Sequence, residues 1–209
     1  AGGYLGLGLW AILLSRKHLA QVFRTVLGMK GGIDESTEPI RYRTALIGFL
    51  LCTFYLIYIG HALGAKWQLM VLFFVIFFLY SVAIARMRAE LGPPAHDLHA
   101  MGPDMILFNA YGARNLARED MAVFSLFFWF NRAYRAHFSA HSMEGFKVAQ
   151  VMKSTARAMM WAIIIAVLVG IVTSFWALLH CFYVHGYSGR PAGDAFSSEA
   201  WNRMAGWVS

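Results

Sequence analysis

Residues 67–85 read WQLMVLFFVIFFLYSVAIA and contain no acidic or basic side chain. Two further apolar runs, residues 44–64 and 159–183, share this property apart from histidine. About twenty such residues form a helix that spans the ~30 Å hydrocarbon core of a bilayer, and a charge at the bilayer centre costs at least about 2.5 kcal/mol. The sequence therefore predicts an all-α, polytopic membrane protein with three complete transmembrane helices.

Lysine and arginine are distributed unevenly between these runs. The chain is 59% hydrophobic and 14% charged, whereas a soluble domain has about 25% charged residues. Residues 16–43 and 86–157 are rich in Lys and Arg, and residues 64–67 and 184–209 are poor in them. Because cytoplasmic loops carry the positive excess, we expect loops 16–43 and 86–157 to be cytoplasmic, in a bacterial inner membrane. The net charge of +7 then requires no nucleic-acid partner.

The first residues, AGGYLGLGLWAILLS, are apolar but too few to cross a bilayer. We interpret residues 1–15 as one partial transmembrane helix and residues 1–209 as a single membrane-embedded segment of a longer chain. The expected partners are the lipid bilayer and the remaining part of that chain or other membrane subunits. Gly2 and Gly6 share a helix face, which favours close packing between helices. Residues 16–27 have the periodicity of an amphipathic helix at the membrane surface.

Residues 86–157 are predicted to be a broken-helix region on the cytoplasmic side. Gly92-Pro93-Pro94 and Gly102-Pro103 interrupt it, and the apolar pieces 105–111 and 121–130 are too short to span a bilayer. We therefore expect short re-entrant or interfacial helices, which are tolerated at membrane depth only where they are buried or line a cavity. Short segments interrupted by Gly and Pro also indicate the binding site of a transporter.

The first candidate site contains His96, Asp97, His99 and Asp104. The His-x-x-His spacing places two imidazoles on one helical face, where a nearby carboxylate could complete a metal site. The same residues could instead carry protons or contact a substrate, since the unperturbed pKa of histidine is about 6.5. They could also cap and hydrogen-bond a loop. The identity of any metal stays open, and no other cofactor is predicted.

The second candidate site contains Asn131, Arg132 and Arg135, which follow the aromatic run FSLFFWF. Arginine is suited to carboxylate or phosphate recognition, so these residues could bind a solute. A basic helix end that contacts lipid phosphates is the alternative. Nearby in the sequence, Arg88 and Glu90 are expected to form a close ion pair, either structural or part of a gate.

Two stretches, ARMRAELGPPAHDLHAMGPDMI (residues 85–106) and SLFFWFNRAYRAH (residues 125–137), carry a resemblance to a known family. The chain resembles an uncharacterised bacterial family of large polytopic membrane proteins, a domain of unknown function. That family is in turn distantly similar to the oligopeptide transporter superfamily, in which an Arg–Glu segment with Gly and Pro follows a spanning helix. Arg88, Glu90, Gly92 and Pro93 stand in the comparable place. The resemblance implies a larger parent protein and transfers no established functional residue.

These observations favour a membrane transporter for a small polar or peptide-like solute. The expected substrate or proton pathway is lined by the two candidate sites, namely His96, Asp97, His99, Asp104, Asn131, Arg132 and Arg135. The alternative is a non-catalytic integral membrane subunit of a larger complex. A metal-dependent membrane enzyme is less favoured, and the sequence contains no phosphate-binding loop, nucleophile elbow or dinucleotide fingerprint.

Overall fold

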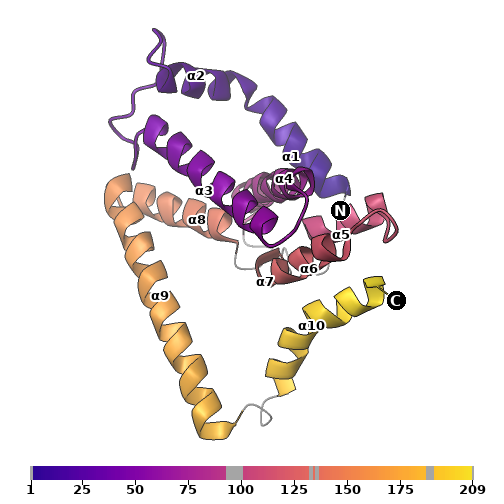
Figure 1. Cartoon of the computed structure of the whole chain (residues 1–209). Helices are drawn as coiled ribbons and strands as arrows, with labels where there is room; N and C mark the ends of the chain where they lie inside the picture. The colour runs from indigo at the N-terminus through magenta and orange to yellow at the C-terminus, as the bar shows by residue number, and fades with distance from the viewer. Residues whose placement is uncertain (1, 93–100, 132–133, 135–136, 187–190, 209) are drawn as a thin grey trace.

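The computed structural model describes residues 2–92, 101–131, 134, 137–186 and 191–208, and these residues contain helices but no strand. The predicted all-α class is confirmed. The helices are α1 (Gly2–Leu14), α2 (Arg16–Val26), α3 (Tyr42–Ala62), α4 (Trp67–Leu91), α5 (Pro103–Tyr111), α6 (Arg118–Leu126), α7 (Phe128–Asn131), α8 (Phe138–Val151), α9 (Ala156–His185) and α10 (Pro191–Val208) (Figure 1).

Three of these helices are long and apolar enough to cross a membrane: α3, α4 and α9, with 21, 25 and 30 residues. They coincide with the three apolar runs of the sequence. The length and composition of these helices indicate that the chain is a membrane protein. Helix α1 has 13 residues, which is too short to span a bilayer alone. Its assignment as part of a fourth spanning helix stays a prediction.

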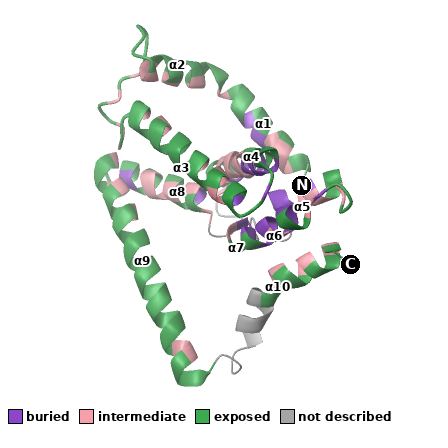
Figure 2. Cartoon of the chain, viewed as in Figure 1, coloured by how far each residue is buried: buried purple, intermediate pink, exposed green. Residues whose placement is uncertain are grey.

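Helix α4 is the centre of the buried core (Figure 2). Helix α1 packs along it, with Tyr4 set edge-on to Tyr80 at a ring-centroid distance of 6.4 Å. The small residue at this contact is Gly8, whose missing side chain leaves room for the carbonyl of Leu79. Gly2 and Gly6 make no such contact with the described residues, because a Cβ at either position would meet nothing within 4 Å, and their packing role stays a prediction.

The described part of the predicted broken-helix region contains four short helices, α5 to α8, and lies against α4. An aromatic seam joins the two parts of the chain: the rings of Phe73 and Phe124 are 5.9 Å apart, and those of Phe77 and Phe130 are 5.3 Å apart. The phenylalanines of α4 therefore form an interhelical contact. Such aromatic pairs contribute beyond the area that they bury.

Helices α6 and α8 contact opposite ends of α4. Asp120, in the first turn of α6, accepts a hydrogen bond of 2.8 Å from the backbone nitrogen of Lys66, just before α4 begins. Glu144 in α8 pairs with Arg88 in the last turn of α4. The stretch from α6 to α8 thus runs parallel to α4 over most of its length.

Helix α9 extends away from this core, and none of its residues is buried (Figure 2). The chain then turns back, and α10 packs against α6 (Figure 1). This return places the end of the chain beside α5, α6 and α7, close to the centre of the broken-helix region.

Candidate functional site

The structure brings together two of the residues predicted from sequence. Asp104 and Asn131 are each 1% exposed, and both lie against Gly102, where a Cβ would fall 3.1 Å from Cγ of Asn131 and would collide with Oδ1 of Asp104. The other predicted residues, His96, Asp97, His99, Arg132 and Arg135, lie outside the described residues.

Local sequence explains why these two residues meet. Gly102 has an extended backbone and precedes Pro103, which begins α5 because its fixed φ suits the first helical position. Asp104 therefore falls in the first turn of α5, where a carboxylate is favoured by the helix dipole. Asn131 is the last residue of α7, and the next helix starts only at Phe138. Both side chains belong to helix ends.

Two tyrosines complete the buried group. Tyr80, from the middle of α4, and Tyr134, between α7 and α8, are both 0% exposed, and their rings lie 5.6 Å apart. The charge of Asp104 acts on the hydroxyl groups of both tyrosines. We refer to Tyr80, Asp104, Asn131 and Tyr134 as the polar cluster.

Arg203 reaches the polar cluster from α10 and forms an ion pair with Asp104. Its guanidinium carbon lies 4.1 Å from the ring centroid of Phe128 and 4.9 Å from that of Trp207. Trp207 in turn stacks on Phe108 of α5, with ring centroids 4.7 Å apart. Sequence reasoning missed Arg203 because no spacing rule links it to Asp104. Its one unusual feature was its position in a tail poor in Lys and Arg.

Many polar atoms in this group have no hydrogen-bond partner among the described residues. They are both hydroxyls of the tyrosines, Oδ1 of Asp104, both amide atoms of Asn131, and Nε and Nη1 of Arg203. A buried donor or acceptor left unpaired costs about 1–3 kcal/mol. A concentration of such atoms is therefore destabilising in a purely structural core and provides both donors and acceptors for a polar ligand.

Charge in this group is balanced by an ion pair. The buried Asp104 carboxylate pairs with the Arg203 guanidinium. Because a lone buried charge is strongly unfavourable, Asp104 can hold either a proton or a cationic partner.

The predicted ion pair between Arg88 and Glu90 is wrong. Arg88 instead donates from Nε and Nη2 to Glu144 of α8, at 2.5 and 3.2 Å, whereas Glu90 accepts from Arg86 one helical turn away, at 2.6 Å. Side chains two positions apart on a helix do not face each other, so Arg88 and Glu90 each pair with a different residue. The Arg88 guanidinium holds the pKa of Glu144 below its usual range.

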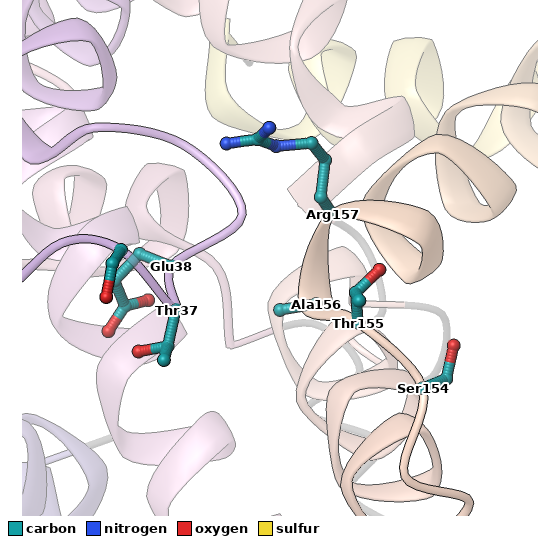
Figure 3. Close-up of a pocket in the computed structure, with 7 residues that line it drawn as sticks. Thr37, Glu38, Ser154, Thr155, Ala156 and Arg157 are labelled. Atoms are coloured by element: carbon teal, nitrogen blue, oxygen red, sulfur yellow. The ribbon is translucent and has the colours of Figure 1, made fainter.

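A polar pocket lies apart from the polar cluster, where the loop before α3 faces the start of α9 (Figure 3). Thr37 and Glu38 stand on one side, and Thr155 and Arg157 stand on the other. Thr155 caps α9 by accepting a hydrogen bond from the backbone nitrogen of Ala158. The lining residues are not buried, so this pocket is weaker evidence for a binding site than the polar cluster.

The described residues contain no group of three or more His, Cys, Asp or Glu side chains arranged to hold a metal ion. The His96–Asp97–His99 candidate is outside these residues, so its metal-binding role stays a prediction. The polar cluster contains one carboxylate, and Arg203 occupies it. The described part of the cluster is therefore better suited to an organic polar group than to a divalent cation.

The whole chain, residues 1–209, matches the model of a family described as "Family of unknown function (DUF6785)". The chain therefore belongs to this family, which confirms the family-level part of the resemblance. No curated protein and no solved structure matches the chain. The similarity to oligopeptide transporters and the bacterial origin gain no support from these comparisons.

Proposed function

We propose that this member of a family of unknown function is part of a membrane transporter, and that the polar cluster with Arg203 is its solute site. The supporting observation is a set of buried polar side chains with atoms that lack hydrogen-bond partners among the described residues, gathered where α5 begins and α7 ends. Such sites at interrupted helices are typical of transporters. The solute is a small polar or peptide-like molecule.

The depth of the polar cluster supports this proposal. At 1.5 Å per residue, Tyr80 lies about 20 Å from the first residue of α4 and about 17 Å from the last. If α4 crosses the membrane, Asp104 beside Tyr80 is near the bilayer midplane. Ionisable residues at that depth are expensive, face the protein interior, and mark ion or substrate pathways.

The proposal changes the expected placement of residues 86–157. Asp120 contacts the beginning of α4, and Glu144 contacts its end. If α4 crosses the bilayer, Asp120 and Glu144 therefore lie on opposite sides and cannot both be cytoplasmic. We infer that α6, α7 and α8 together make an interrupted crossing, with α8 at the cytoplasmic end. His96, Asp97, His99, Arg132 and Arg135 stay predicted pathway residues.

The peptide-like part of the proposed solute depends on sequence resemblance. The segment Arg88, Glu90, Gly92 and Pro93 lies at and just after the end of α4, and in oligopeptide transporters an Arg–Glu segment with Gly and Pro follows a spanning helix. The test is uptake by the full-length protein in proteoliposomes. The assay offers labelled di- and tripeptides, single amino acids and uncharged polar solutes, with and without a proton gradient. We expect gradient-dependent accumulation of at least one class.

The matched variants for this assay are Asp104→Asn and Glu119→Gln. Asp104 is 1% exposed and belongs to the polar cluster, whereas Glu119 is exposed on α6 and lies outside the polar cluster. We expect the first substitution to abolish uptake and the second to leave it within about twofold, because exposed substitutions away from a site change little. Equal uptake by Asp104→Asn and the unmodified protein would exclude the polar cluster as the solute site.

A non-catalytic membrane subunit is the second candidate, and α9 favours it. This helix has 30 residues and none is buried within the chain, so its apolar surface is available to neighbouring helices or lipid. Purification of the native particle in mild detergent distinguishes the two functions. Fixed stoichiometry with other subunits, together with no uptake of any solute, would favour the subunit and exclude the transporter.

A further inference from the structure

Asp104 and Phe128 surround the guanidinium group of Arg203. The carboxylate forms an ion pair with it, and the Phe128 ring lies 4.1 Å from its central carbon. A carboxylate combined with an aromatic face is a general arrangement for organic cations, because the ring quadrupole attracts positive charge. The arrangement is built from α5 and α7, whereas the cation comes from α10.

Charge balance restricts what can happen to this pair. Asp104 is 1% exposed, and removing one member of a buried ion pair leaves an uncompensated charge, which is strongly unfavourable. If Arg203 leaves with α10, Asp104 therefore requires another positive partner or a proton. The Phe128 ring favours an organic cation over a small hydrated metal ion, since weakly hydrated cations lose less on contact with an aromatic face.

We propose that Asp104 and Phe128 bind an ammonium or guanidinium group of the transported solute, and that Arg203 occupies this position while α10 is docked. This inference rests on the proposed transport function and adds its substrate class. The remaining N–H groups of the solute donate hydrogen bonds to oxygens that lack a partner among the described residues. These oxygens belong to Asp104, Asn131 and the two tyrosines. Arg203 is then an internal competitor that keeps the buried carboxylate neutralised between transport cycles.

Binding of the cation and release of α10 are coupled in this scheme. Trp207 stacks on Phe108 while Arg203 is bound, so a solute that displaces Arg203 also uncovers Phe108. The exposure of position 108 can be measured in the full-length protein in lipid nanodiscs, with Phe108→Cys introduced and other reactive cysteines replaced. The readout is the rate at which this cysteine reacts with a maleimide. The probes are methylguanidinium chloride and methylurea, which have similar shapes but differ in charge. We expect methylguanidinium to increase the rate of maleimide labelling severalfold and methylurea to leave it unchanged.

Two control variants separate this site from a general effect of the cation. Asp104→Asn in the Phe108→Cys background should remove the response to methylguanidinium, although basal labelling rises because α10 is held less firmly. Tyr111→Cys, exposed on the same helix, should label at the same rate with either probe. A response that survives Asp104→Asn, or equal responses to both probes, overturns the inference.

A second measurement covers the case in which Phe108→Cys weakens the docking of α10. Arg203→Ala leaves Asp104 without its cation, so we expect a lower unfolding temperature that methylguanidinium restores and methylurea does not. No restoration overturns the inference. Uptake confined to neutral or anionic solutes overturns it while leaving the transporter proposal in place, whereas absence of all uptake overturns the transporter proposal itself.

Discussion

Gly8 shows how one missing side chain determines the packing of a whole helix. It is buried where α1 meets α4, and the carbonyl of Leu79 occupies the space that a Cβ would fill. Small residues allow helix backbones to approach closely in membranes, where van der Waals packing replaces the hydrophobic driving force between helices. Any larger residue at position 8 must therefore separate α1 from α4.

Gly8→Ala should destabilise the protein by about 1–3 kcal/mol, as expected when a packed contact is overfilled. Gly6→Ala is the matched control, because a Cβ there would meet nothing within 4 Å and alanine favours a helix by about 1 kcal/mol relative to glycine. Thermal unfolding in detergent measures both. Equal effects of the two substitutions would contradict the close approach of α1 to α4 at Gly8.

Asp120 connects two elements and acts through its backbone partners. Its carboxylate accepts hydrogen bonds from the backbone nitrogens of Lys66 and Ala117, at 2.8 and 3.1 Å, and its side chain is fully buried. Asp120 thereby caps the start of α6 and attaches this helix to the turn between α3 and α4. The start of the interrupted crossing is positioned by these hydrogen bonds as well as by apolar packing.

Asp120→Ala should lower the free energy of unfolding by about 1–3 kcal/mol, because it leaves two part-buried backbone N–H donors without partners. Glu119→Ala, at the exposed neighbouring position, should change it by less than about 0.5 kcal/mol. Chemical denaturation of the purified protein compares the two. If both substitutions had the same small effect, Asp120 would not be the residue that attaches α6 to the α3–α4 turn.

The ion pair between Arg88 and Glu144 joins α4 to α8 and predicts an acid-dependent stability. Arg88 lowers the pKa of Glu144 from its ordinary value of 4.5, so the folded state binds fewer protons at this group than the unfolded state. The pair therefore stabilises the fold above that ordinary value, and its contribution is lost as the pH falls through the lowered pKa.

Unfolding temperatures of the unmodified protein and Glu144→Gln should differ at pH 7 and converge in acid. The same comparison in an Arg88→Gln background should show a smaller difference at pH 7, since the partner is already absent. A difference that persists unchanged at low pH, or in the Arg88→Gln background, would assign the effect of Glu144 to something other than this pair.

At the scale of the whole molecule, the interrupted crossing makes a topological prediction. Arg118 and Lys147 are both exposed and lie near opposite ends of α4. In a background without other reactive cysteines, Arg118→Cys and Lys147→Cys should be labelled from opposite sides of a sealed membrane by an impermeant maleimide. Lys147→Cys should react from the cytoplasmic side. Labelling of both from the same side would exclude a crossing by α6 to α8.

Local properties of the sequence were sufficient for most of the elements. The apolar runs 44–64, 67–85 and 159–183 predicted α3, α4 and α9, because hydrophobicity over about twenty residues is a property of the run itself. The Gly-Pro steps likewise predicted the interruptions in residues 86–157, since proline cannot continue a helix and is tolerated only in its first turn. Asp104 was a candidate because it is a carboxylate close in sequence to His96 and His99, and Asn131 because it precedes Arg132 and Arg135 after an aromatic run.

Packing between distant residues decided the rest of the candidate site. Arg203 is separated from Asp104 by 99 positions, and Tyr80 is an ordinary residue of an apolar helix until Tyr134 and Asp104 are placed beside it. The partner of Arg88 also changed, from Glu90 to Glu144, because helical geometry turns neighbours two residues apart away from each other. Periodicity and composition describe one segment at a time, whereas a buried charge is neutralised by whichever segment the fold brings to it.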